Sequence, residues 1–279
     1  MPVGFVVTSA DATETDNPVT APVVFDRGVY ALRRLRAEQA EAKSFLVRHA
    51  AENLSARLTA VKRRFNSGLE LNSRGQSFEI LAEHAEHWVR TSLHPRSNSV
   101  SLVGDEEFLP FAAHSFDLVV STLGLHAAND LPGALLQIQR SLRPDGLFMA
   151  AMFGGATLNE LRRAFASGEA EQTGGVSPRV APFADVRDAG ALLQRAGFAL
   201  PVADVDRIAV HYGSFATLVD DLHNLGETNA LAQRRRSFLR RGVLSAALAS
   251  YACNDAQGGK LAATFDVLYL TGWAPEAMD

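Results

Sequence analysis

Two short apolar runs constrain the fold of this chain more than any other feature. FDLVVS at residues 116–121 and LFMAAMF at residues 147–153 are almost continuously apolar. Such runs are typical of parallel strands, because helices cover both faces of a parallel sheet. A helical pattern over Leu131–Leu142 separates them. The two runs therefore belong to one strand–helix–strand unit.

The same alternation extends over most of the chain. Further strands are expected at Leu69–Leu71, Ser99–Val103, Val202–His211 and Ala262–Trp273, and further helices at Gln76–Glu86, Leu158–Phe165 and Val186–Ala196. Strands that alternate with helices favour an α/β fold with a doubly wound, mostly parallel sheet. A chain of 279 residues is long enough to bury such a core.

The domain organisation follows from where this alternation begins. Residues 1–24 are predicted to be a flexible leader. Apolar residues then recur at three- and four-residue spacing from Val29 to Phe65, which predicts an N-terminal helical segment over residues 25–66. The α/β domain would span residues 67–279, with a helical insert at about 214–255 before the last strand.

The start of the chain carries acidic residues (Asp11, Glu14 and Asp16), which is not typical of a secretory signal or a transit peptide. Cys253 is the single cysteine, so no intramolecular disulfide can form, as suits a reducing compartment. No apolar run reaches the roughly 20 residues that span a bilayer. Together these features predict a cytoplasmic protein.

The formal net charge of −4 gives no reason to expect nucleic-acid binding. Two segments of the chain are nevertheless basic. One is the helical stretch 29–64, and the other is an arginine cluster in the insert, formed by Arg234, Arg235, Arg236, Arg240 and Arg241. The cluster is interpreted as a solvated or protein-facing helix face. The stretch 29–64 is either a solvated face or a docking surface for an acidic protein partner or an anionic membrane surface.

The stretch SGLELNSRGQSFEI at residues 67–80 raises the question of a nucleotide-like ligand. Glu70 lies near the end of the first strand, and Asn72-Ser73-Arg74-Gly75 form the turn into the next helix. Open α/β sheets bind ligands at the carboxyl ends of their strands, where Glu70 could accept hydrogen bonds from a ribose or an ammonium group. A turn that approaches a nucleotide closely needs glycines, and this one offers only Gly75. An ordinary strand-to-helix turn is the alternative.

Other polar residues follow later strands. Asp105, after Ser99–Val103, could accept a hydrogen bond from an adenine amino group, with Leu109-Pro110-Phe111 as a wall for the base; an acidic surface loop is the alternative. His126 is either a pocket residue or a core histidine. His84 and His87 share a face of the expected helix, but no third ligand follows from the spacing, so no metal site is predicted.

The run GDEEFLPFAAHSFDLVVSTLGLHAANDLPGALLQIQRSLRPDGLFMAAMFGG resembles the middle of class I S-adenosylmethionine-dependent methyltransferases. The motifs GGVSPRVAPFADVRDAGALLQRAGF and GWAP extend the likeness over most of the chain. It is strongest to the branch of the mitochondrial respiratory complex I assembly factor of methyltransferase type, which is akin to the malonyl-carrier-protein methyltransferase of biotin synthesis. The resemblance implies a seven-stranded sheet whose last strand is antiparallel and inserted between its neighbours.

The resemblance also implies S-adenosylmethionine as cofactor, bound at the ends of the first three strands. By position, Glu70 matches the acid of the family's first motif, and Asn72, Ser73, Arg74 and Gly75 occupy its glycine-rich turn. Asp105 and Glu106 match the adenine-side motif, and Leu123 and His126 line the region after the fourth strand.

Three departures from the family pattern concern this site. The turn has one glycine, the stretch Trp88–His94 lacks the acid that grips the ribose hydroxyls, and Ala127 replaces the aromatic residue after His126. Arg74 could compensate by pairing with the cofactor's carboxylate through its bidentate guanidinium group.

Two functions stay open. The first is a protein-binding assembly factor or adaptor, related to respiratory complex I, whose cofactor loop is degraded and whose partner binds residues 29–64 and the loop 174–183. The second is an active S-adenosylmethionine-dependent methyltransferase, or an arginine-modifying enzyme, acting on a protein or a small acidic acceptor. A methyl transfer needs mainly orientation and exclusion of water, so the lack of an obvious catalytic triad does not count against it.

Overall fold

The computed structural model describes residues 23–40, 43–94 and 102–276. Seven strands follow one another in the order β3-β2-β1-β4-β5-β8-β6. They are β1 (Phe65–Leu71), β2 (Ala85–Ser92), β3 (Leu102–Val103), β4 (Phe116–Thr122), β5 (Leu142–Phe153), β6 (Ala199–Tyr212) and β8 (Lys260–Trp273). β8 runs antiparallel between β5 and β6, and the other neighbouring pairs are parallel. The predicted doubly wound α/β fold, with its antiparallel last strand inserted between its neighbours, is confirmed.

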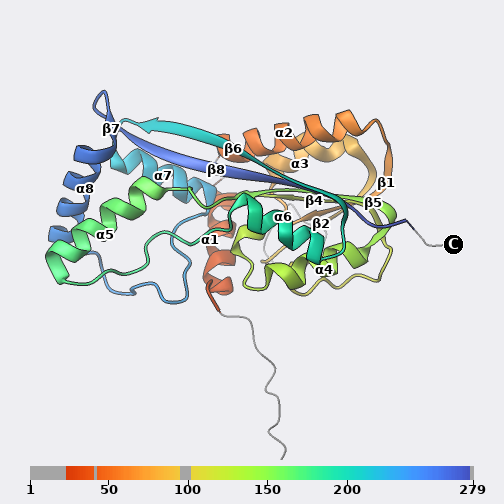
Figure 1. Ribbon diagram of the computed structural model, residues 1–279, viewed down its shortest axis with the longest axis horizontal. Coiled ribbons are helices and arrows are strands. Elements are labelled where there is room, and N and C mark those ends of the chain that lie inside the picture. The colour runs from red at the N-terminus through yellow and green to blue at the C-terminus, as the bar shows by residue number, and fades with distance from the viewer. Residues whose placement is uncertain (1–22, 41–42, 95–101, 277–279) are drawn as a thin grey trace, which may run out of the picture.

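Helices cover both faces of the sheet (Figure 1). α2 (Phe45–Val61) and α3 (Gly75–Leu81) lie on one face, and α4 (Leu131–Ser141) and α6 (Val186–Arg195) lie on the other. Alternate residues of β4 therefore enter different cores: Leu118 and Val120 join the core of the α2 face, and Val119 joins the core beneath α4 and α6. Burial on both sides explains why FDLVVS is apolar almost throughout.

Two predicted helix limits are wrong. The helix expected at Gln76–Glu86 ends at Leu81, a 3₁₀ turn covers Ala82–His84, and β2 begins at Ala85. Glu86 and His87, near the start of β2, are polar and exposed, so this part of the strand lacks the apolar alternation that marks a strand. The helical pattern up to Phe65 also divides into α1 (Arg27–Gln39) and α2, and Phe65 itself begins β1. Phe65 fits either element by pattern because its side chain is buried in the same core as α2.

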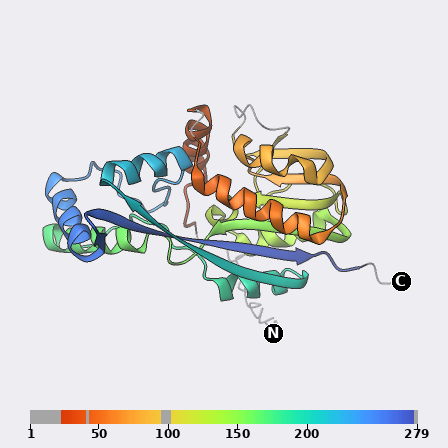
Figure 2. The ribbon, with the colours of Figure 1, turned by 90° about the horizontal axis from the view of Figure 1, so that it is seen from above.

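A second group of helices lies at one end of the sheet. α5 (Asn159–Thr173), α7 (Phe215–Leu225) and α8 (Arg241–Asp255) lie on one side of the ends of β6 and β8, which continue as a two-stranded ribbon beyond β5 (Figures 1 and 2). The short β7 (Ala256–Gln257) pairs with β8. α1 lies between this group and the rest of the sheet and contacts α7. The chain start predicted as a leader lies, up to residue 22, outside the described residues.

α5 and α8 pack closely at Gly168. A methyl group at this position would lie 2.6 Å from the backbone nitrogen and 2.9 Å from the Cα atom of Ala247. Gly168→Ala should therefore lower the free energy of unfolding by about 1–3 kcal/mol, as overpacking does, although alanine alone would favour the helix by about 1 kcal/mol. Urea unfolding measures the change.

Gly190→Ala in α6 is the matched control for this prediction. Its new methyl group would meet the Cβ atom of Ala203 at an ordinary 3.7 Å, so this variant should be more stable than the wild type. Stabilisation by both substitutions would contradict the close α5–α8 contact.

Candidate cofactor site

The turn that follows β1 is tied to β2 by its backbone. Asn72 has the left-handed φ of 50°, and its N–H donates to Oγ1 of Thr91 at 3.1 Å. The N–H of Ser73 donates to the carbonyl oxygen of Thr91 at 2.7 Å. Asparagine tolerates this conformation better than most residues, which explains how the turn forms without glycine at this position. Two backbone donors of the turn are thus used within the chain.

Thr91→Val should remove the acceptor of the Asn72 N–H while keeping the shape of this buried side chain. A buried donor left without a partner costs about 1–3 kcal/mol, so the free energy of unfolding should fall by that amount in a urea titration. Thr59→Val, on the exposed surface of α2, is the control and should change stability little. If the two variants lowered the free energy of unfolding equally, the hydrogen bond from Asn72 to Thr91 would not stabilise the turn as proposed.

Glu70 is fully buried and its carboxylate is occupied. Ser77 donates its hydroxyl to Oε1 at 2.6 Å, and the hydroxyl of Ser73 donates to Oε2. Nε of Arg90 lies 3.6 Å from Oε2, and its guanidinium group stacks on the ring of Phe78 at 3.9 Å. Burial raises the pKa of Glu70, against the opposing effect of the two serines and Arg90. The residue therefore holds the turn and α3 together, and a ligand would have to displace those partners.

Arg74 belongs to a buried group of charges that we name the Glu227 cluster. Its members are Tyr30, Arg34, Arg74, His126 and Glu227. Arg74 donates Nη1 to the carbonyl oxygen of Leu225 at 2.6 Å, and its Nη2 lies 3.2 Å from Oε1 of Glu227. Burial lowers the pKa of Arg74 to about 9, with a further lowering from Arg34. Both ends of the guanidinium fork are thus bound to the end of α7 and the segment after it, so Arg74 is not free to hold a cofactor carboxylate.

Other members of the Glu227 cluster come from α1 and from the loop after β4. The Tyr30 hydroxyl lies 3.0 Å from Oε1 of Glu227, and Nε2 of His126 lies 3.0 Å from Oε2. Arg34 donates to the carbonyl oxygens of Leu123 and Asn72, both at 2.8 Å. Burial opposes the charge of Glu227, but His126, Arg74 and Arg34 together lower its pKa to about 2. The cluster therefore joins α1, the turn after β1, the loop after β4 and the segment after α7.

The adenine-side acids are paired with a residue from the start of α1. Nη2 of Arg27 lies 2.7 Å from Oδ1 of Asp105 and 3.0 Å from Oε2 of the buried Glu106. Nη1 of Arg27 also donates to the carbonyl oxygen of Ala127 at 2.9 Å. Burial raises the pKa of Glu106 despite the attraction of Arg27. An arginine of this chain thus neutralises the carboxylates expected to face the adenine.

The structure also places the remaining expected positions. β2 ends at Ser92, which has no carboxylate to grip a ribose. Ala127 is fully buried in a small core with Phe25 and Tyr30, so side chains from the N-terminal segment pack where the family's aromatic residue is missing. Leu109 and Phe111 pack against the core beneath α4 and α6.

The Glu227 cluster is a feature that sequence reasoning missed. Glu227 lies 197 residues from Tyr30, and no spacing or periodicity links the two. The sequence offers Arg74 and His126 as separate candidates, but nothing in it pairs them with a carboxylate beyond α7.

Two cavities flank the Glu227 cluster. One, of about 520 Å³, lies between α1, the start of α2 and the turn Asn72–Gly75, and Ser92 also lines it. The other, of about 220 Å³, is mainly apolar and is lined by α5, α7 and the loop 179–183, with His126 and Glu227 in its wall. The larger cavity has the size of an ordinary ligand pocket. Asp105 and Glu106 line neither of these cavities.

The histidine pair does not form the predicted helix face. His84 ends the 3₁₀ turn, where its Nε2 lies 2.8 Å from the Ser55 hydroxyl, and His87 lies in β2. Among the described residues, no three His, Cys, Asp or Glu side chains are grouped so that they could hold a metal ion.

The comparisons with known proteins agree with this architecture. A family model described as a methyltransferase domain matches residues 74–150. A human protein named arginine-hydroxylase NDUFAF5, mitochondrial, is 39% identical over 265 residues, which cover 90% of this chain and 76% of the human protein. This chain belongs to the NDUFAF5 family. The predicted resemblance to class I methyltransferases and to this branch is confirmed.

This member of the NDUFAF5 family also resembles two proteins outside that family, at lower identity. The malonyl-[acyl-carrier protein] O-methyltransferase of Xylella fastidiosa is 36% identical over 179 residues, 64% of this chain and 59% of that protein. The crystal structure of YcgJ from Bacillus subtilis matches with a TM-score of 0.56 at 13% identity, over 82% of this chain and all of that chain. The second similarity is one of fold alone.

The predicted cytoplasmic location is wrong, because the human relative is named a mitochondrial protein. That prediction depended on the cysteine count and on the acidic start of the chain, and neither feature determines the cellular compartment of the protein. In the described ranges, no helix has the length and apolar character needed to cross a bilayer.

Proposed function

We propose that this member of the NDUFAF5 family is a protein-binding assembly factor or adaptor that works without S-adenosylmethionine. The observation that supports this proposal is the internal pairing of the groups that would hold the cofactor. Glu70 is bound by Ser73 and Ser77, Asp105 by Arg27, and the turn's backbone donors by Thr91.

The cost of reopening such a site argues against tight cofactor binding. Each hydrogen bond lost from a buried polar group costs about 1–3 kcal/mol, and about 1.4 kcal/mol is a tenfold change in affinity. A ligand that displaced Ser73, Ser77 and Arg27 would therefore lose several powers of ten in affinity. Ser92 offers no charged acceptor that would offset this loss.

The partner-binding surface is proposed to include the loop 174–183, where Val176 is 63% exposed. The basic stretch 29–64 contributes less free charge than its composition indicates. Arg34 is buried, and Arg48, Arg57 and Arg63 pair with carboxylates of this chain. Arg36, Lys62 and Arg64 remain exposed for an acidic partner.

Mass spectrometry of the purified, acid-denatured protein tests the proposal. The extract should contain no more than traces of S-adenosylmethionine or S-adenosylhomocysteine relative to protein. About one equivalent of either compound would mean that the pairs described above open for the cofactor, and the proposal would fail.

A second candidate is an S-adenosylmethionine-dependent enzyme that modifies arginine, since the human relative is named an arginine hydroxylase. The cavity of about 520 Å³ beside the turn is the observation that favours it. An equivalent of bound cofactor in the same extract would support this candidate.

A further inference from the structure

The segment that leads into α8 has an exposed run of basic and apolar residues. We name residues 235–241, which end at the first residue of α8, the basic loop. The expected helix face is wrong for Arg234, Arg235, Arg236 and Arg240, because these residues precede α8 and are not helical. Four of its residues are exposed arginines: Arg235, Arg236, Arg240 and Arg241. The side chain of Phe238, between the two arginine pairs, is 100% exposed. The basic loop thus presents four cationic side chains and one large apolar side chain on a single short segment.

The arginines of the basic loop have no carboxylate at ion-pair distance among the residues that the structure describes. The preceding residue shows the contrast: Nη1 of Arg234 lies 3.0 Å from Asp26 and donates to the carbonyl oxygen of Leu231. No ion pair or side-chain hydrogen bond joins any of the four arginines of the basic loop to another described side chain. Their charge is therefore available to an external anion.

The basic loop begins beside the start of α1, where the preceding Arg234 pairs with Asp26, and leads away from it into α8. The chain between α7 and α8 runs along the outer edge of the molecule and enters α8 at the opposite end from β1 (Figure 1). None of its four arginines bonds to Glu70, Asp105 or the Glu227 cluster, so the inference does not depend on the proposed function.

We propose that the basic loop binds an anionic phospholipid surface. Arginine side chains interact with lipid phosphates at the membrane surface, and an aromatic side chain beside them can enter the interface between head groups and acyl chains. A bilayer accepts this arrangement without a shaped partner groove. Single-stranded nucleic acid is less suited, because it is held by several stacked aromatic residues, whereas Phe238 is the single aromatic residue in the basic loop.

Co-sedimentation of the full chain with lipid vesicles tests this proposal. At low salt, the protein should bind phosphatidylcholine vesicles that contain about one third phosphatidylglycerol at least about tenfold more tightly than pure phosphatidylcholine vesicles, and added salt should weaken the binding. Arg235→Glu combined with Arg236→Glu should reduce binding by about tenfold or more. Phe238→Ala should reduce it several-fold without changing its salt dependence.

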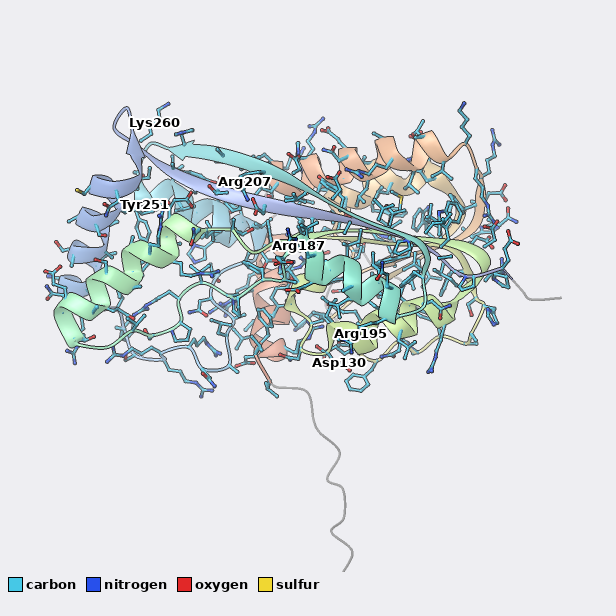
Figure 3. The ribbon with its side chains drawn as sticks, viewed as in Figure 1. Asp130, Arg187, Arg195, Arg207, Tyr251 and Lys260 are labelled. Atoms are coloured by element: carbon cyan, nitrogen blue, oxygen red, sulfur yellow. The ribbon has the colours of Figure 1, made fainter. Side chains whose placement is uncertain are left out.

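Matched controls come from other exposed positions. Arg187→Glu combined with Arg195→Glu makes the same charge change on α6, well away from α8 (Figure 3). Phe108→Ala removes another phenylalanine that is 78% exposed. Both control variants should bind vesicles nearly as the wild type does.

Three outcomes would overturn the proposal. They are no vesicle binding by the wild type, equal losses in the basic-loop and control variants, and undiminished binding by the basic-loop variants. Binding of a single-stranded oligonucleotide that requires Arg235 and Arg236, without vesicle binding, would instead assign the basic loop to nucleic acid.

Discussion

Glu227→Gln should lower the free energy of unfolding by about 3–5 kcal/mol, the usual cost of removing one partner from a buried ion pair. Glutamine keeps the size of the side chain and one carbonyl acceptor, so the change isolates the charge. Without that charge, the buried Arg34 and Arg74 lose the carboxylate that lies within 4 Å of both guanidinium groups. Urea unfolding at neutral pH measures the loss.

The cost of Glu227→Gln should depend on pH. The pKa of Glu227 is about 2 in the folded protein, below its ordinary value of 4.5. A carboxylate with a lowered pKa stabilises the fold above the unfolded-state pKa, and this stabilisation is lost as the pH falls through the folded-state pKa. The stability difference between wild type and variant should thus be constant above about pH 5 and shrink between about pH 5 and pH 2.

Glu86→Gln is the control for this experiment, because Glu86 is exposed on β2. Its substitution should change stability by less than about 0.5 kcal/mol. If Glu227→Gln changed the free energy of unfolding at neutral pH as little as Glu86→Gln does, the Glu227 cluster would not hold α1 to the segment after α7 as the structure indicates.

Restoring two family features should create cofactor binding. Ser92→Asp would return a carboxylate to the end of β2, and Asn72→Gly would remove a side chain from a left-handed position that glycine adopts freely. Hydrogen bonds to a charged group contribute about 1.5–3 kcal/mol each. Two ribose hydroxyls bound by the new carboxylate would therefore raise the affinity by about a hundredfold or more. Arg74 stays unchanged because it supports Glu227.

Calorimetric titration with S-adenosylhomocysteine measures this gain. The control combines Asn72→Gly with Ser92→Asn, which has nearly the same shape but no charge. The aspartate version should bind and the asparagine version should bind far more weakly. Equal behaviour of the two would mean that the missing ribose acid is not what prevents binding.

The sheet could be predicted from the sequence wherever burial on both faces made a strand continuously apolar, as in FDLVVS and LFMAAMF. The start of β2 could not be predicted, because its polar residues Glu86 and His87 are adjacent and exposed and show no alternation. Among the site residues, the position of Glu70 at the end of β1 followed from the strand pattern. The hydrogen-bond partners of Glu70 could not be predicted in this way, because Ser73 and Ser77 are ordinary residues of a turn and a helix.

The contacts that fill the candidate site are long-range and polar. Arg27 reaches Asp105 across 78 positions, and Arg74 reaches Glu227 across 153. A single sequence contains no periodicity that reports such pairs, and a basic stretch is usually interpreted as a solvated face. The departures at the turn, at the end of β2 and at Ala127 can be seen in the sequence, but the pairing of Arg27 with Asp105 and of Arg74 with Glu227 became visible only in three dimensions.

Calorimetric titration of the wild-type protein with S-adenosylmethionine and S-adenosylhomocysteine tests the central claim most directly. Our account predicts no saturable heat up to millimolar ligand, because the groups at the sheet edge are already paired. Micromolar binding that Asp105→Ala abolishes would contradict it and would show that Arg27 releases Asp105 to the cofactor.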